Sequence, residues 1–451
     1  MNKPHYRHFS HALAVILSVA AAKAPQAQED GFFDIVEVEE EEEEEAPEQD
    51  DNTFWTQRGY LQQKIKYGLD IPDPQFGFER QQMGLTQVRT ELFAELRHRP
   101  SQSFQWQISA RAETNLLQWH NGNTKWGSNN SVVFLRDAFF DLTLDSTWLR
   151  LGNQVIAWGQ SEGLNITDVF SLKDLREPGQ SQLQNIRDPI PAAQLFFPLG
   201  PGKLYSVLTW SAGLDRYAGF RDEFYSLGGQ KKAGVEFDQI APEEKWEAGL
   251  RYLIPFNGGD VNLVTAVINN NTPTVEAISS GAKGDPPTVV FTQKRQTFVG
   301  LSASRVISSW VLRSELGYLK DLPTSTLTER QSQRRAMAGV EYAGISNWLF
   351  GFEFNGLDTV PTVATTPGTS AWGYMARANY NGFNDRLKGW LWIMKLAQEG
   401  ASIVRGDLTY HLSDRLQLEL GLVSYQSSDQ ESLLYPFRYH DSVNLAFKYD
   451  F

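Results

Sequence analysis

The sequence has no cysteine and only seven histidines. The absence of cysteine excludes disulfides, thiolate metal sites and a lipid-anchored cysteine. Only His98, His120, His411 and His440 follow the N-terminal region, and they do not recur at the spacing of metal ligands. Neither a Gly-x-Ser-x-Gly turn nor a phosphate-binding glycine loop is present. The sequence therefore predicts no enzyme, no metal centre and no cofactor.

Long apolar runs are also missing. No stretch reaches the ~18 apolar residues that a transmembrane helix needs. The N-terminus has the features of a secretory signal, because Lys3 and Arg7 precede a short apolar core at Ala12 to Ala22 and small residues allow cleavage after Ala27. This core is too short to span a bilayer. Residues 1–27 are therefore predicted to be a cleaved signal peptide.

Basic residues are absent from one acidic segment. Between Glu29 and Asp51 there are 14 acidic residues, and Glu39 to Glu45 form an unbroken run. This segment accounts for the net charge of −13 and leaves the rest of the chain near neutral, which argues against nucleic-acid binding. Because it has little apolar mass to bury, we predict that residues 28–53 are a disordered periplasmic segment. The alternative is that the apolar residues beside the acidic run dock on a periplasmic partner.

What the sequence does contain, from Trp55 onward, is a repeat of strands of about ten residues separated by turns. The last strand shows the pattern clearly, since an apolar face alternates with a polar one. Its apolar face consists of Val443, Leu445, Phe447, Tyr449 and Phe451. A soluble sandwich would also alternate. The 12% aromatic content and the charges of both signs in mid-strand favour a barrel in lipid with a wet lumen.

The predicted fold is all-β: a single transmembrane antiparallel barrel over residues 54–451. Eighteen strands can be placed, with sixteen as the runner-up, and short turns alternate with long connections except near Glu399. Outer-membrane barrels have short periplasmic turns and long external loops. We therefore predict location in the bacterial outer membrane, in contact with its lipid. Tyr449 and Phe451, at the end of the last strand, are predicted to form the signal that the barrel-assembly machinery reads.

The connection after the fifth strand, at about residues 158–189, is the main candidate for a functional site. In porins this loop folds into the lumen, and the same position here predicts a constriction. The alternative is an external loop whose charges are only solvated. Thr167 or Asp168 is predicted to cap a short helix through about Arg176. The candidate constriction and lumen residues are Asp168, Lys173, Asp174, Arg176, Glu177, Arg187 and Asp188, together with Arg136, Asp137, Asp141, Arg150 and Gln154 in the two preceding strands.

These two strands carry further expectations. A tight turn at Asp145 would bring Asp141 close to Arg150 across the ladder. Trp158 is predicted to anchor a strand end at the membrane interface. The other strands offer a balanced set of lumen charges: Arg89, Arg97, Arg111, Arg251, Arg313, Arg377 and Arg405 against Glu91, Glu95, Glu113, Glu247, Glu315, Glu341 and Asp407. No ion selectivity follows from such a balance.

A motif runs from Leu135 to Pro178: an Arg-acid-Ala-aromatic strand, a Leu-Gly-x-Gln strand, a Trp-Gly turn and an Asp-Val segment. The matching positions are Arg136, Asp137, Ala138, Phe139, Leu151, Gly152, Gln154, Trp158, Gly159, Asp168, Val169 and Asp174. The stretch resembles an uncharacterised family of proteobacterial outer-membrane proteins. That family usually has Asn-Pro where this chain has Ser171-Leu172. The chain is also loosely similar to the alginate-export class of barrels.

The resemblance implies a role beside exporters of the resistance-nodulation-division class and a periplasmic lipid-carrier-like protein, and hence an apolar or lipid-like cargo. The predicted function is an outer-membrane channel whose barrel is constricted by the connection after the fifth strand. The alternative is a plugged barrel that acts as a binding or assembly partner of a periplasmic exporter complex.

Overall fold

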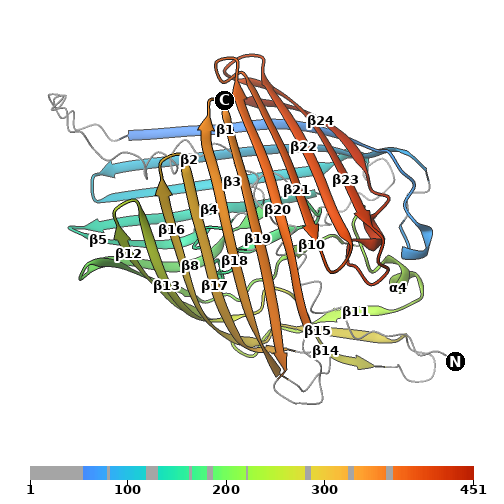
Figure 1. The fold of residues 1–451 in the computed structure, drawn as a ribbon, viewed down its shortest axis with the longest axis horizontal. Coiled ribbons are helices and arrows are strands. Elements are labelled where there is room, and N and C mark those ends of the chain that lie inside the picture. Colours follow the sequence, from blue (N-terminus) through green and yellow to red (C-terminus); the bar gives the residue numbers. More distant parts are fainter. Residues whose placement is uncertain are drawn as a thin grey trace.

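The computed structural model describes residues 54–78, 82–117, 131–161, 165–179, 186–219, 222–279, 286–323, 330–361 and 369–451. The predicted signal peptide and acidic segment lie outside the described residues. Eighteen strands form one closed antiparallel sheet, because β1 pairs with both β2 and β24 (Figure 1). The barrel and its eighteen strands are therefore confirmed.

The barrel strands follow the predicted ranges closely. In chain order they are β1 (Phe54–Gly68), β2 (Gly84–Ser101), β3 (Phe104–Asn115), β4 (Ser131–Leu144), β5 (Thr147–Gln154), β8 (Ile190–Leu199), β9 (Gly202–Thr209), β12 (Glu247–Phe256), β13 (Gly259–Asn269), β16 (Arg295–Ile307), β17 (Trp310–Pro323), β18 (Arg330–Ile345), β19 (Trp348–Pro361), β20 (Thr369–Gly382), β21 (Leu387–Leu396), β22 (Ala401–His411), β23 (Leu416–Ser427) and β24 (Ser442–Asp450). Each pairs with its two barrel neighbours, and the backbone of Gly59 exchanges two 2.9 Å hydrogen bonds with that of Phe451 at the seam.

Short turns join the strands at one end of the barrel and mostly long connections join them at the other. Two-residue turns need positive φ, and Asp145, Ser308 and Asn347 have φ of 50°, 54° and 69°. The short connection near Glu399 is the predicted exception on the long-connection side. The two ends of the barrel are therefore structurally distinct.

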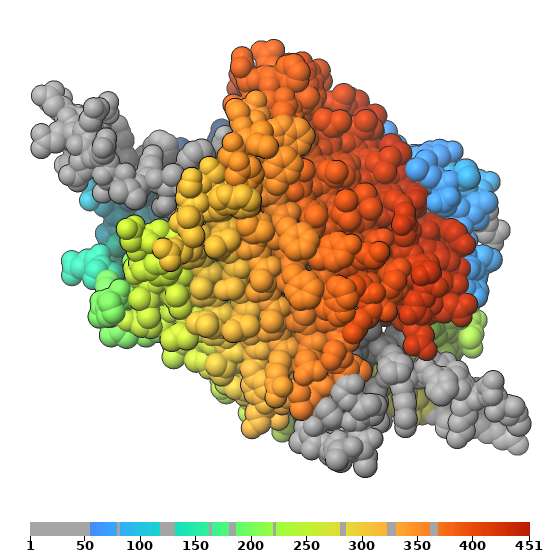
Figure 2. Space-filling view, viewed as in Figure 1, coloured from blue at the N-terminus to red at the C-terminus, as the bar shows by residue number. Residues whose placement is uncertain are grey.

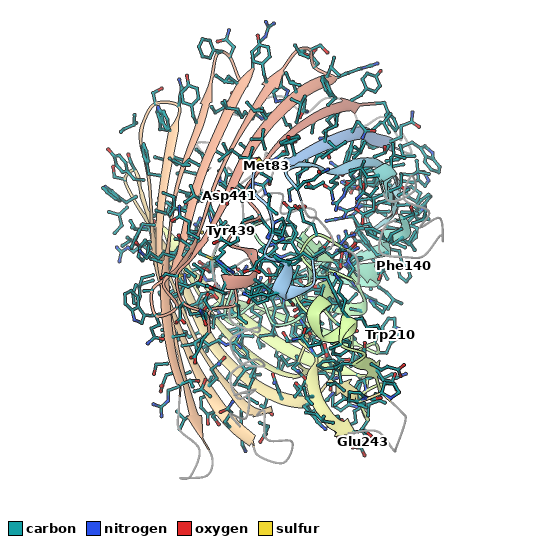
Figure 3. The ribbon with its side chains drawn as sticks, turned by 90° about the vertical axis from the view of Figure 1, so that its right-hand side faces the viewer. Met83, Phe140, Trp210, Glu243, Tyr439 and Asp441 are labelled. Atoms are coloured by element: carbon teal, nitrogen blue, oxygen red, sulfur yellow. The ribbon has the colours of Figure 1, made fainter. Side chains whose placement is uncertain are left out.

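The outer face of the wall is apolar, as the alternation predicts. Leu312 and Leu316 on β17 and Phe352 on β19 are exposed. The wall from β16 to β24 presents a continuous surface in Figure 2. Figure 3 turns the long-connection end toward the viewer and shows Phe140 and Trp210 at the outer side of the barrel. Among the described residues, no helix combines the length and apolar character needed to cross a membrane.

Smaller elements lie in the long connections. One three-stranded sheet contains β6 (Leu172–Leu175), β7 (Arg187–Asp188) and β10 (Arg216–Tyr217), and another contains β11 (Glu236–Gln239), β14 (Thr274–Ser279) and β15 (Thr288–Thr292). Short helices accompany them in the described residues, namely η2 (Pro74–Phe76), α4 (Gly228–Lys232) and η3 (Tyr435–Phe437).

The inward face changes character along the barrel. On β13 it runs from Asn262, near the short turns, to buried Ile268, near the long connections. The strand β22 runs in the opposite direction, so its buried Ile403 lies near the long connections and Arg405 lies nearer the short turns. These apolar inward residues belong to one buried cluster with residues of the long connections, including Phe170. The prediction of a polar lumen therefore holds for only part of the inner wall, because connections pack against inward apolar residues such as Ile268 and Ile403 elsewhere.

Candidate functional site

The connection from β5 to β8, residues 155–189, is called the inserted segment below. It joins two neighbouring strands, since Gln154 lies opposite Ile190. Nevertheless its described residues contact strands far around the barrel, among them β1, β3, β17, β22 and β23. A connection between adjacent strands can reach all of these only by crossing the bore.

On one side of the bore a single carboxylate binds four backbone amides of the inserted segment. Glu315 on β17 is fully buried. Its Oε1 accepts hydrogen bonds from the backbone N–H groups of Gln160 (2.5 Å) and Ser161 (2.9 Å). Its Oε2 accepts those of Ile166 (2.8 Å) and Thr167 (2.9 Å). A carboxylate has about four lone-pair sites, so these four amides use its full accepting capacity.

On the other side the inserted segment is held by buried ion pairs. The Lys66 ammonium on β1 lies 3.1 Å from Glu177 of the segment and 3.3 Å from Glu223 of the connection after β9. Arg176 lies 2.6 Å from Glu113 on β3. The Lys66 side chain is 1% exposed. Burial alone would raise the pKa of Glu177, but Lys66 and the other nearby cations together outweigh burial and hold that pKa well below its usual range.

Two backbone carbonyls complete this side. Tyr425 on β23 donates its hydroxyl to the carbonyl of Pro178 at 2.7 Å. Arg405 on β22 donates to the carbonyl of Gly179 at 3.0 Å. Gly179 has φ of 72°, and a Cβ there would lie 3.0 Å from the Ile403 side chain, so both conformation and space favour glycine.

Between the two sides, Asp168 organises the inserted segment. Its Oδ1 accepts from the backbone of Trp158 (3.2 Å) and the hydroxyl of Ser171 (2.9 Å), and its Oδ2 lies 2.8 Å from Arg187. Burial would raise the pKa of Asp168, but Arg187, Lys173 and the hydrogen bond from Ser171 together outweigh burial and lower that pKa. The prediction that Thr167 or Asp168 caps a helix is wrong. The chain runs into the strand β6 instead, because β6 gains backbone partners from β7 and β10.

The third charge cluster ties the inserted segment to the connection after β9. Asp174 lies 2.6 Å from Arg176 and 3.0 Å from Arg216 of β10, and Arg216 also pairs with Asp188 at 2.5 Å. Burial would raise the pKa of Asp174, but Arg176 and Arg216 outweigh it and hold that pKa far below its usual range. The structure thus brings the predicted charges together in two sets of ion pairs. Asp168 and Arg187 form one set, and Asp174, Arg176, Arg216 and Asp188 form the other. That these residues act as a constriction remains a prediction.

The candidates on β4 and β5 lie in the wall. Arg150 and Asp141 are opposite each other, 2.6 Å apart. Asp137 accepts from Ser109, and Arg136 lies 3.9 Å from Asp137. Gln154 is fully buried, where it donates to the carbonyl of Ala192 at 2.7 Å. These five side chains are held by neighbours in the wall, so their geometry fits a supporting role.

Trp158 was predicted to lie at the membrane interface, and this is wrong. Its side chain is 4% exposed and packs edge-on against Phe170, with ring centroids 5.2 Å apart. The chain turns into the bore directly after β5, so Trp158 belongs to the packing of the inserted segment.

Most of the predicted lumen charges are neutralised by one another. Glu341 binds both Arg377 and Arg313, Arg405 lies 2.7 Å from Asp407, and Arg111 lies 3.7 Å from Glu91. The balance of signs predicted from the sequence is therefore a balance of contacting pairs.

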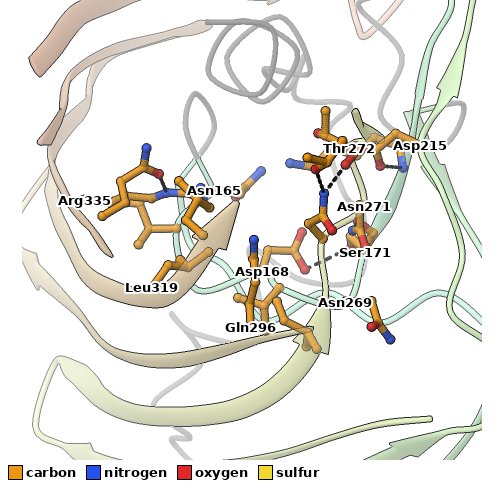
Figure 4. A pocket seen from close by; sticks show the side chains of 18 of the residues that line it. Asn165, Asp168, Ser171, Asp215, Asn269, Asn271, Thr272, Gln296, Leu319 and Arg335 are labelled. Carbon is orange, nitrogen blue, oxygen red and sulfur yellow. Dashed lines mark hydrogen bonds between the residues drawn. The ribbon is translucent and has the colours of Figure 1, made fainter. Parts of the chain in front are cut away.

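A cavity of about 120 Å³ lies between the inserted segment and β13, β16, β17 and β18 (Figure 4). Its lining includes Asp168 and Lys173 of the inserted segment, Asp215 of the connection after β9, and Arg335 of β18. Several amide side chains complete it, namely Asn165, Asn269, Asn270, Asn271, Gln296 and Gln333. Within the described ranges, no group of three or more His, Cys, Asp or Glu side chains could hold a metal ion.

Two features of the site were missed from the sequence. Glu315 appeared only as one of many lumen carboxylates, since its partners are backbone amides that leave no trace in the sequence. Asp215 and Arg216 lie in a connection that was treated as an external loop. Their only signal was the pair of opposite charges next to each other in a long connection.

The barrel-end residues Tyr449 and Phe451 have exposed side chains. Phe451 lies at the seam with β1, where a Cβ on Gly59 would approach its ring to 2.7 Å. That the barrel-assembly machinery recognises Tyr449 and Phe451 remains a prediction.

Part of the chain matches a known family model. Residues 91–211 match a family model described as "Protein of unknown function (DUF1302)". The match covers about a quarter of the chain and includes Leu135 to Pro178, which carries the resemblance seen in the sequence. No curated protein matches the sequence.

Solved structures share the fold at low identity. OccAB3 of Acinetobacter baumannii is 9% identical with a TM-score of 0.54, and the match covers 88% of this chain and 99% of that one. OccAB2 of the same organism is 10% identical with a TM-score of 0.51, covering 88% and 98%. OccK2 (OpdF) of Pseudomonas aeruginosa, solved in complex with glucuronate, is 10% identical with a TM-score of 0.50, covering 88% and 97%. The chain thus has the fold of porin-like outer-membrane β-barrels, and part of it resembles the matched family of unknown function.

Proposed function

We propose that this protein is an outer-membrane channel for small polar solutes, in which the inserted segment forms the constriction. The observation that carries the proposal is the attachment of this segment to opposite sides of the bore, by Glu315 on β17 and by Lys66 on β1. A solute that crosses the barrel would pass along its charged side chains, and charges at a narrow point set selectivity.

The lining of the cavity bears on the class of solute. Ten of the nineteen lining residues carry amide or charged side chains, beside apolar residues such as Ile268 and Leu319. The resemblance implies an apolar or lipid-like cargo, whereas this lining favours a polar one, because an apolar solute would leave these groups without hydrogen bonds. Export through a cleaved signal at residues 1–27 and insertion through the strand that ends at Phe451 are part of the proposal.

Planar-bilayer recording tests the channel. Replacing residues 165–178 with a short Gly-Ser linker leaves the joined strands adjacent, since Gln154 still pairs with Ile190. We expect the single-channel conductance to rise severalfold, because the variant lacks the part of the segment that crosses the bore. A matched variant that shortens the connection after β19, between Pro361 and Thr369, should conduct as the wild type does. Equal conductance of the wild type and the 165–178 variant would exclude the inserted segment as the constriction.

The second candidate is a plugged barrel that recruits a periplasmic exporter complex. It is favoured by the packing of connections in the bore, where Phe170, Phe224 and Leu434 join one buried cluster with the wall. Removal of residues 28–51 separates the two functions. A channel should conduct normally without them, whereas an assembly factor should lose its periplasmic partner in a pull-down.

A further inference from the structure

The cavity beside the inserted segment carries one positive charge that is not compensated. Asp168 is paired with Arg187 at 2.8 Å. Asp215 accepts a hydrogen bond from the backbone of Lys173 at 2.9 Å and attracts its ammonium. Arg335, in contrast, has no ion pair within the described part of the chain, and its Nε donates to the neutral Gln333 at 2.6 Å. A site with these pairs and one unmatched guanidinium favours one added negative charge.

Two cations converge on the cavity. Lys173 and Arg335 both line it, from the inserted segment and from β18. Burial is the main cause that lowers the pKa of the Lys173 ammonium, and Arg335 is near enough to lower it further. Figure 4 shows Arg335 and Asp215 toward opposite sides of the cavity. The Arg335 side of the cavity is therefore its most electropositive part.

Unused hydrogen-bonding groups point to the rest of the ligand. Gln296 and Asn165 line the cavity and are 2% and 5% exposed. Among the described residues, the Nε2 donor of Gln296 and the Oδ1 acceptor of Asn165 have no partner. A buried polar group without a partner costs about 1–3 kcal/mol. A ligand that accepts from Gln296 and Arg335 and donates to Asn165 would satisfy these groups together.

The volume of the cavity narrows the class of ligand. An apolar cavity of ~150 Å³ in another protein takes up benzene, so about 120 Å³ suits a molecule of roughly six non-hydrogen atoms. We propose that this cavity is a binding site for a small hydroxy-monocarboxylate, whose carboxylate contacts Arg335 and whose hydroxyl donates to Asn165. The inference deepens the proposed channel function by naming a solute class, but binding can be measured without conduction.

Isothermal titration of the detergent-solubilised full-length protein with lactate tests the site. Wild type should bind lactate saturably, with a Kd on the order of 1 mM. Arg335→Gln should weaken binding at least tenfold, because a charge-assisted contact is lost. Arg334→Gln is the matched control, since the neighbouring Arg334 is 68% exposed on the outer face. Propionate, which lacks the hydroxyl, should bind about fivefold more weakly than lactate, and propane-1,2-diol should not bind.

The outcomes separate this inference from the channel. Saturable lactate binding that Arg335→Gln abolishes and Arg334→Gln leaves intact supports the site, even when the protein does not conduct in a bilayer. Lactate binding that is equal in both variants overturns it. A protein that conducts but does not bind lactate or propionate also overturns it, while the channel function stands. Arg335→Lys keeps the charge, so partial recovery of binding distinguishes loss of charge from misfolding.

Discussion

The two sides of the inserted segment are fixed by different chemistry. Near β17, one carboxylate binds four backbone amides of residues 160–167. Near β1 and β3, charged side chains of residues 176 and 177 bind charged side chains of the wall. The first kind of contact depends on the path of the chain, and the second depends on which side chains it carries. The difference explains why only one side could be recognised in the sequence.

The contacts between Glu315 and the four backbone amides can be removed by Glu315→Leu. Four buried N–H groups would then lose their acceptor, and each orphaned group costs about 1–3 kcal/mol. We expect residues 155–189 to detach, with added protease cutting the folded barrel there and with larger, noisier conductance. Leu316→Ala, on the outward face, is the control. Full protease resistance of Glu315→Leu would contradict this account of the anchor.

The ion pairs near β1 can be broken by Lys66→Met, which removes the contacting counter-charge of buried Glu177. Removal of one partner of a buried pair costs about 3–5 kcal/mol, so the barrel should unfold at lower temperature in a gel-shift assay. Glu177→Gln in the same chain should restore more than half of the loss. Lys448→Met removes a more exposed pair with Asp450 at 3.1 Å, and we expect an effect of at most about 1 kcal/mol.

Ligand binding in the cavity beside the inserted segment should respond to pH. Burial raises the pKa of Asp215 to about 6, against the opposing effect of Lys173. Because folding raises this pKa, the folded state takes up a proton as pH falls through 6, which adds stability and removes a negative charge from the cavity. Lactate should therefore bind a few-fold more tightly at pH 5 than at pH 7.5 in the titration. Asp215→Asn should remove this dependence, and a dependence unchanged in that variant would exclude Asp215 as its origin.

Much of the wall was predictable because each strand residue faces either lipid or lumen, and the alternation of apolar and polar residues records this. The strand ranges, the count of eighteen and the short connection near Glu399 follow from it. The inward apolar residues Ile268 and Ile403 follow another rule, since they pack on connections that lie far away in the sequence. No local pattern could indicate that contact.

The candidate site likewise contains features that the sequence could predict and features that it could not. Lys173, Asp174, Arg176 and Glu177 stood out because their side chains are charged, and the structure gives them charged neighbours. The helix expected after Asp168 was wrong, because strands β7 and β10 supply partners that local preference ignores. Trp158 was misplaced because an aromatic residue at a strand end is typical both of an interface and of a buried turn into the bore.

The seam between β1 and β24 bears on the order in which the protein folds. It joins residues 60–68 to residues 442–450, so nearly the whole chain lies within one closed loop. The ring cannot close strand by strand during synthesis, because its final ladder requires the last residues of the last strand. Until then both outer strands expose unpaired backbone groups that attract other chains. Long-range pairing of this kind is slow, and the nascent sheet therefore depends on protection of its two edges until they meet.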